Sequence, residues 1–185
     1  GAPVRQAYGL TEANLTAINA PPDEAVMGSS GRPVAGVEVR IADENSSELE
    51  RGTHGEVLLR GPNVMAGYLV DAHATAHVMR GGWLHTGDIG FVDEDGRLSI
   101  ADRSKDLILR GGASIYPSEV ESVLTHHPSV REAAVVGKAD DYYGEEVVAL
   151  IVLREPIGPE AIERWVRERL APYKVPRFYA FVESL

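Results

Sequence analysis

Three stretches concentrate the side chains that could do chemistry: residues 6–12, 83–90 and 102–121. In the first stretch, the ring of Tyr8 could stack on a base, the hydroxyl of Thr11 could donate to a phosphate, and the carboxylate of Glu12 suits a hard cation. The same residues also fit a loop that leads into a helix capped by Thr11, because hydroxyl side chains are common caps. Taken alone, this stretch leaves both interpretations open.

The second and third stretches combine acidic groups with glycine. Asp88 offers two acceptor oxygens, which suit the vicinal hydroxyls of a ribose, and the glycines around it allow close backbone approach. A turn with an Asx cap would explain the same residues. In the third stretch, the alternating charges of residues 102–106 could instead belong to a solvated hairpin.

Other common sites lack support in the sequence. No His or Cys spacing is typical of a metal site, and no Walker-type glycine-rich loop with a terminal Lys-Ser/Thr occurs. His126 and His127 fall at the predicted end of a helix, where they serve as ordinary caps, and no histidine is assigned to a metal.

Residues 30–101 are predicted to be predominantly β. Alternating apolar residues indicate strands at residues 36–43 and around Val57 and Leu59. Residues 90–92 and 98–100 are predicted to form a hairpin, in which Gly96 adopts a positive φ.

After Asp102 the pattern becomes α+β. One helix is predicted behind Pro117 and ends by Pro128, and a second is predicted behind Pro159. Strands are predicted at residues 130–136 and 147–153. The change of pattern predicts a short hinge near Asp102, between a first part at residues 1–102 and a second at 103–185.

Composition narrows the function classes. With 28 acidic and 18 basic residues the net charge is -10, which argues against a nucleic-acid partner, and the acidic bias is interpreted as a solvated surface. The absence of cysteine excludes disulfides and thiolate chemistry. No apolar run reaches the roughly 20 residues of a membrane helix, and residues 1–5 lack the order of a signal peptide, so a cytoplasmic location is expected.

Four ordered motifs together resemble the adenylate-forming superfamily, which includes acyl-CoA synthetases, luciferases and peptide-synthetase adenylation domains. They are the Tyr-Gly-x-Thr-Glu motif at Tyr8, the motif from Gly55 to Tyr68, Trp-x-x-Thr-Gly-Asp at Trp83 to Asp88, and Asp-Arg-x-Lys-Asp at Asp102 to Asp106. The resemblance extends to residues 170–176 and so covers nearly the whole chain.

The resemblance implies roles residue by residue. Tyr8 and Gly9 would lie against the adenine of ATP or AMP, Thr11 would bind the α-phosphate, and Glu12 would hold Mg²⁺. Asp88 and Arg103 would hold the ribose hydroxyls, a pairing that suits a diol.

In the second part, the resemblance makes Lys105 the hinge of a mobile domain and places Gly112 beside the pantetheine tunnel of CoA. Glu119 and Glu121 are expected to support the fold.

The resemblance also has gaps. The chain begins at the adenine motif, without the family's phosphate loop or most of the acyl pocket, and it stops before the segment that carries the catalytic lysine. Lys174 and Lys138 do not match that lysine. The expected fold is therefore α+β: residues 1–102 are the β-rich, distorted barrel-like end of the large domain, and 103–185 are a small α+β lid. The chain is interpreted as an inactive fragment of a longer enzyme.

For that enzyme the resemblance implies an AMP-forming acyl-CoA ligase, acting on a small carboxylic acid with ATP, Mg²⁺ and CoA. A role in fatty acid metabolism and possible homo-oligomers are further expectations. The Tyr116-Pro117 step favours acyl- or aryl-CoA ligases over amino-acid-activating domains. Two alternatives stay open: delivery to a carrier protein, and a non-catalytic fragment that self-associates through exposed apolar surface.

Overall fold

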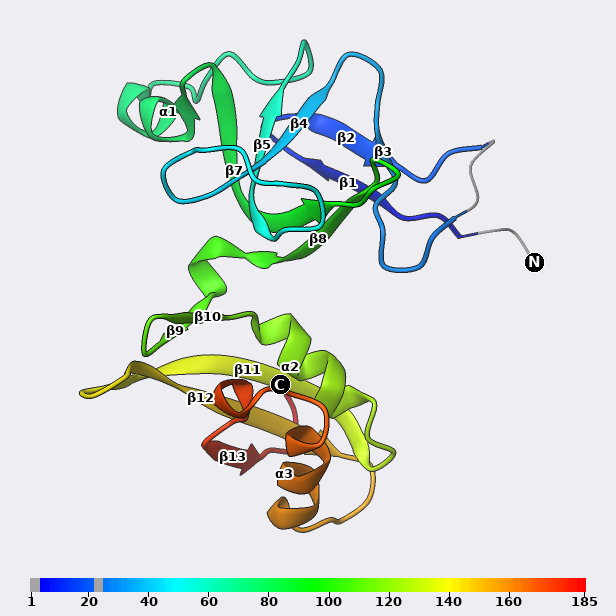
Figure 1. The fold of residues 1–185 in the computed structure, drawn as a ribbon, viewed down its shortest axis with the longest axis vertical. Helices are drawn as coiled ribbons and strands as arrows, with labels where there is room; N and C mark the ends of the chain where they lie inside the picture. The colour runs from blue at the N-terminus through cyan, green and yellow to red at the C-terminus, as the bar shows by residue number, and fades with distance from the viewer. Residues whose placement is uncertain (1–3, 22–24) are drawn as a thin grey trace. The chain divides into compact units, whose positions relative to one another are not determined.

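The computed structural model describes residues 4–21 and 25–185, so the first three of the residues considered above for a signal peptide lie outside it. The chain divides into two compact units, Gly1–Ser104 and Lys105–Leu185. The first is β-rich and the second mixes helices with one sheet, which confirms the predicted α+β class (Figure 1). The division falls two residues after the boundary expected from the change of pattern.

The first unit contains two antiparallel sheets around a shared core. The three-stranded sheet has β1 (Ala7–Leu10), β2 (Asn14–Ile18) and β3 (Arg32–Pro33). The five-stranded sheet runs β4 (Glu38–Ala42), β5 (Gly55–Arg60), β7 (Trp83–Val92) and β6 (Met79–Arg80), with β8 (Leu98–Arg103) also paired to β7. Ala13 in the turn between β1 and β2 and Ala17 in β2 share that core with residues of the larger sheet, which are Val57, Leu84 and Leu98. Burial of apolar surface therefore holds the two sheets together.

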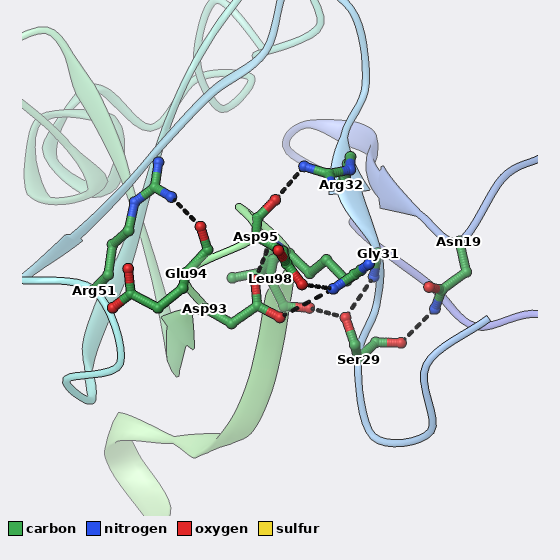
Figure 2. A network of polar contacts seen from close by, with 10 residues as sticks. Asn19, Ser29, Gly31, Arg32, Arg51, Asp93, Glu94, Asp95 and Leu98 are labelled. Atoms are coloured by element: carbon green, nitrogen blue, oxygen red, sulfur yellow. Dashed lines mark hydrogen bonds and ion pairs between the residues drawn. The ribbon is translucent and has the colours of Figure 1, made fainter. Parts of the chain in front are cut away.

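A buried polar network also joins the sheets (Figure 2). Asn19, just after β2, donates to the carbonyl oxygen of Ser29. The Ser29 hydroxyl donates to the carbonyl oxygen of Leu98 in β8 over 3.1 Å and accepts from the Gly31 amide over 3.0 Å. Because both Ser29 and Asn19 are buried, these bonds satisfy groups that water cannot reach.

The predicted hairpin between β7 and β8 is confirmed, and Gly96 in its turn has a φ of 78°. The hairpin between β1 and β2 and the short helix α1 (Ala72–Val78) were not anticipated. Helix α1 has no buried residue, and so its sequence carries no apolar periodicity.

The 3-10 turn η1 (Ser104–Asp106) spans the division between the units, and the second unit contains a five-stranded sheet. Its order is β10 (Ala113–Ile115), β9 (Ile108–Arg110), β12 (Gly144–Leu153) and β11 (Val130–Asp140), and β13 (Phe178–Phe181) pairs in parallel with β12. Strands β11 and β12 are longer than the apolar runs predicted, since their outer ends extend beyond the core.

Two helices complete the core of this unit. Helix α2 (Pro117–Thr125) and helix α3 (Pro159–Arg167) each begin at the predicted proline. Their buried residues join one cluster with the strands, and Trp165 Nε1 of α3 donates to the Val123 carbonyl of α2 over 2.9 Å. The turn η2 (Pro172–Lys174) precedes β13. No helix in the described part of the chain has the length and apolarity that crossing a bilayer requires.

Candidate nucleotide-binding site

The hairpin of β1 and β2 carries the first group of predicted residues. Gly9 is required by close approach, because a Cβ there would lie 2.4 Å from the carbonyl oxygen of Asn14. Thr11 lies exposed in the turn between the strands, so the alternative of a helix cap at Thr11 is wrong. A tight strand-to-strand turn, with Asn14 at a φ of 50°, takes the place of the helix.

Glu12 follows Thr11 in this turn and has two tethers. Its side-chain Oε1 accepts a hydrogen bond from the Tyr68 hydroxyl over 2.8 Å, and its carbonyl accepts from the Met65 amide over 2.7 Å. The bond to Glu12 raises the pKa of the Tyr68 phenol, which therefore stays a donor at neutral pH. Tyr68 was missed as a site residue, although it closes the motif quoted from Gly55; only the fold shows its contact.

Asp88 lies in the middle of β7 and is 7% exposed. The alternative of a turn with an Asx cap is therefore wrong. Asp88 stands directly opposite Arg103 in the ladder of β7 and β8. Arg103 Nε lies 3.3 Å from Asp88 Oδ1, while the guanidinium is largely exposed. A buried carboxylate thus meets an arginine that reaches solvent.

Tyr8 completes the group from the other sheet. Its hydroxyl donates to Asp88 Oδ2 over 2.6 Å. Burial raises the pKa of the Tyr8 phenol, and the hydrogen bond and negative charge of Asp88 raise it further. The Tyr8 phenol therefore remains protonated. Its hydroxyl continues to donate to Asp88, and this bond holds the ring in place.

These side chains share one open pocket of about 610 Å³ in the first unit. Its lining residues are Tyr8, Gly9, Leu10, Thr11, Glu12, Asp88, Ile100, Ala101, Asp102 and Arg103. All six residues expected at the nucleotide and its metal are in this set. The pocket offers an aromatic ring, a hydroxyl, three carboxylates of different exposure and a guanidinium, which together suit a nucleotide.

The donor set fits a magnesium ion bound mainly through a ligand. No group of three or more His, Asp or Glu side chains in the described ranges could hold a metal by itself. Magnesium often binds through one or two carboxylates plus substrate phosphates and waters. Glu12, half-buried beside Thr11, can supply one such carboxylate.

Lys105 and Gly112 belong to the second unit. Lys105 is its first residue and lies exposed in η1. Gly111 and Gly112 form the two-residue turn between β9 and β10, with φ values of 58° and 83°. Such a turn needs positive φ at both positions, which explains both glycines within this unit. A Cβ at Gly112 would meet no atom within 4 Å, so the space next to it is open.

Glu119 and Glu121 of α2 each contact another segment of the second unit. Lys174 Nζ lies 2.7 and 2.6 Å from the two carboxylate oxygens of Glu119, and Glu121 Oε1 accepts from the Val135 amide over 2.8 Å. Both contacts fit the fold-supporting role expected of this pair. His126 caps α2, since its Nδ1 lies 2.6 Å from the Ser122 carbonyl oxygen.

Two family models match the chain. The model of the AMP-binding enzyme matches residues 1–69, and the model of the AMP-binding enzyme C-terminal domain matches residues 119–185. The 2-succinylbenzoate–CoA ligase of Bacillus licheniformis is 42% identical over 185 residues, which are 99% of this chain and 38% of the relative. The chain thus spans about two fifths of the length of the curated relatives it matches.

Solved structures agree with these matches. MenE of Bacillus subtilis, an O-succinylbenzoate CoA synthetase solved with ATP and a magnesium ion, is 38% identical with a TM-score of 0.87, over 99% of this chain and 38% of that one. The amide bond synthetase McbA of Marinactinospora thermotolerans is 44% identical with a TM-score of 0.90, over 100% of this chain and 39% of that one.

The expected role in fatty acid metabolism has no support in these comparisons. The relatives are named for 2-succinylbenzoate, a substituted benzoate. The names do support ligase chemistry and AMP binding as the common theme of the matched proteins.

Proposed function

The chain belongs to the AMP-binding enzymes, and from that premise we propose that it supplies the ribose-binding pocket and the C-terminal lid of an ATP-dependent acid–CoA ligase. The observation that carries this proposal is the meeting of Tyr8, Asp88 and Arg103, from three separate stretches of sequence, in one pocket. The activity as a whole belongs to a protein of the relatives' length, of which these residues form a part.

In this proposal each pocket residue has one task. The ring of Tyr8 lies against the adenine, and Gly9 keeps the adjacent backbone close to β2. The buried Asp88 accepts from the ribose hydroxyls, and Arg103 balances its charge from the solvent side. Thr11 donates to the α-phosphate at the exposed turn.

Glu12 would hold Mg²⁺ at the phosphates of ATP. The tether from Tyr68 fixes one of its carboxylate oxygens and leaves the other for the ion. The ion, when bound, offsets the negative charge that builds up as pyrophosphate leaves.

The reaction has two halves. The carboxylate of the acid attacks the α-phosphorus of ATP, which gives an acyl-adenylate and pyrophosphate; the CoA thiol then attacks the acyl carbon, which gives the thioester and AMP. Placing the reactants in line supplies most of the rate of the first half, because a carboxylate is already a nucleophile. This chain contributes by fixing the nucleoside.

The second unit is proposed to turn about Lys105 between the two halves. Lys105 lies at the division between the units, where a change of backbone angles would turn one unit relative to the other. Gly112 then borders the path of the CoA thiol, and the open space around it would admit the pantetheine chain. Closure of this unit shields the acyl-adenylate from water.

The acceptor has a second candidate. McbA, named as an amide bond synthetase, is as similar to this chain as the CoA ligases are, so an amine could replace the thiol in the second half.

A chimera distinguishes the two acceptors. In it, the 185 residues replace the matching segment of the B. licheniformis ligase. Formation of 2-succinylbenzoyl-CoA supports the proposal, whereas an adenylate transferred only to amines or to a carrier protein overturns the CoA assignment.

The nucleotide site itself is tested on the chain alone. AMP is titrated into the ¹⁵N-labelled 185-residue protein and the perturbed amides are mapped. We expect a dissociation constant on the order of millimolar, since ribose contacts without a phosphate loop leave much of the ligand unheld. The perturbed amides should surround Tyr8, Asp88 and Arg103. Perturbations elsewhere, or submicromolar affinity, would contradict the proposal.

A further inference from the structure

Strand β7, which carries Asp88, contains a β-bulge at that residue. In the ladder of β5 and β7, Glu56 pairs with Ile89 and Leu58 pairs with His85. Between these pairs, β7 has the three residues 86–88, whereas β5 has only Val57. Gly87 in the bulge has a φ of 72°, which few other residues adopt. Bulges of this kind next to a site change the direction of a side chain.

Thr86 holds the bulge from within. Its hydroxyl donates to the carbonyl oxygen of Val57 over 2.8 Å and accepts from the amide of Asp88 over 3.1 Å. The single hydroxyl thereby joins the unpaired residue of β5 to the backbone of Asp88 itself. A methyl group in its place would leave both backbone groups without this partner.

Glu56 holds the bulge from the neighbouring strand. Its Oε1 accepts from the Gly87 amide over 3.1 Å. Its other oxygen, Oε2, lies 2.8 Å from Nδ1 of the buried His85, and Nη2 of Arg80 lies 2.8 Å from that same nitrogen. The carboxylate is therefore fixed on both sides, and the backbone just before Asp88 is fixed with it.

We propose that Thr86 and Glu56 are positioning residues for nucleotide recognition, because their hydrogen bonds to the bulge aim the carboxylate of Asp88 into the pocket. The inference rests on the proposed function, in which Asp88 binds the ribose diol. Neither side chain lines the pocket. They act through Asp88, and so they determine how well the protein distinguishes a ribose from a deoxyribose.

The test uses the 185-residue chain and two ligands, AMP and 2′-deoxy-AMP. Thr86→Val replaces the hydroxyl by a methyl of similar size, and Thr86→Ser keeps the hydroxyl as the matched control. The wild type and Thr86→Ser should bind AMP more tightly than 2′-deoxy-AMP. In Thr86→Val, affinity for AMP should fall about fivefold to tenfold, while affinity for 2′-deoxy-AMP stays within about twofold, so the preference disappears.

A second variant covers the case in which Thr86→Val does not fold. Glu56→Ala removes the acceptor of the Gly87 amide, whereas Glu56→Gln retains an acceptor oxygen and should restore the preference for AMP. Equal losses for both ligands in the valine and alanine variants would assign the bulge a structural role alone and overturn the inference. An unchanged preference for AMP would overturn it as well.

Failure of the proposed function gives a different result. If the proposed function is wrong, the wild type itself shows no preference between AMP and 2′-deoxy-AMP. Crystal structures of the ligand-free variants then test, without any nucleotide, whether the bulge aims Asp88. Loss of the Tyr8–Asp88 hydrogen bond in Thr86→Val, with the bond kept in Thr86→Ser, supports the aiming of Asp88 by the bulge. Retention of the bond in Thr86→Val overturns it.

Discussion

The hydroxyl of Tyr8 donates a 2.6 Å hydrogen bond to Asp88, across 80 residues of sequence and between two sheets that share no ladder. Tyr8 belongs to the three-stranded sheet and Asp88 to the five-stranded one. The pocket is lined from both sheets, so this bond links its two walls. In the proposed function, this bond holds the adenine side and the ribose side of the site in register.

Tyr8→Phe should lower the free energy of unfolding by about 1–3 kcal/mol, because the buried carboxylate of Asp88 loses a donor while the ring stays. Urea unfolding of the purified chain measures the change. Tyr142→Phe is the control, since Tyr142 is 85% exposed. Equal stabilities of Tyr8→Phe and the wild type would show that the bond across the sheets adds nothing.

Asp88→Ala should raise the KM for ATP about tenfold or more in the chimeric ligase described above, with a smaller effect on the KM for the acid. The physical reason is the loss of both acceptors for the ribose hydroxyls. Asp141→Ala removes an exposed carboxylate of the second unit and should leave both constants unchanged. A KM for ATP that does not respond to Asp88→Ala would remove Asp88 from the nucleotide site.

The predictable parts of the fold are those with local causes. Alternating apolar residues predicted β4 and β5, and Pro117 and Pro159 marked the starts of α2 and α3. These signals are reliable because the spacing of apolar residues and the fixed φ of proline both act within a single element. At Thr11 the sequence left a phosphate-binding loop and a helix cap open, because a hydroxyl side chain suits a cap as well as a turn. Only pairing with β2 decides between them.

The site residues likewise divide into those that the sequence indicates and those that only the structure reveals. Motifs of a resembling family pointed to Tyr8, Asp88 and Arg103, and the structure brings the three together. Thr86, Glu56 and Tyr68 lie inside the quoted motifs but received no role, because each acts through a contact with a backbone group or side chain that sequence spacing does not reveal. Residue type indicates possible chemistry, whereas the bulge that orients Asp88 depends on the registers of two neighbouring strands.

Ser29→Ala should destabilise the chain by about 1–3 kcal/mol, since the carbonyl of Leu98 loses a donor and the amide of Gly31 loses its acceptor (Figure 2). Thermal and urea unfolding both report this change. Ser30→Ala alters a neighbouring hydroxyl but retains the backbone bond from the Ser30 amide to the Leu98 carbonyl, and should be nearly neutral. Equal losses of stability in Ser29→Ala and Ser30→Ala would show that the hydrogen bonds of the Ser29 hydroxyl add no stability of their own.

Glu146 makes the second unit sensitive to acid. Its buried carboxylate accepts from Arg110 Nε over 2.7 Å and from Arg177 over 3.0 Å, and the hydrogen bond from Arg110 is the main cause that lowers the pKa of Glu146 below its ordinary 4.5. A depressed pKa stabilises the fold above pH 4.5, and this contribution is lost as the pH falls from there through the folded-state pKa.

Glu146→Gln should therefore cost about 3 kcal/mol at pH 7, and the difference from the wild type should shrink below pH 4.5. Urea unfolding at a series of pH values measures it. Glu155→Gln, at an exposed position, is the control. A difference that stays constant from pH 7 down to pH 3 would show that the charge of Glu146 is not the stabilising feature.

Lys105→Pro tests the proposed hinge. Proline fixes φ at position 105 and restricts the residue before it, so the backbone at the division between the units can no longer adopt two sets of angles. In the chimeric ligase, pyrophosphate release in the first half-reaction should persist, whereas thioester formation from the preformed acyl-adenylate should fall at least tenfold. Lys105→Ala, which keeps a free φ, should retain both half-reactions. If proline slows both halves equally, the motion between them does not pass through Lys105, and the turn at Ser104–Asp106 serves only to connect the two units.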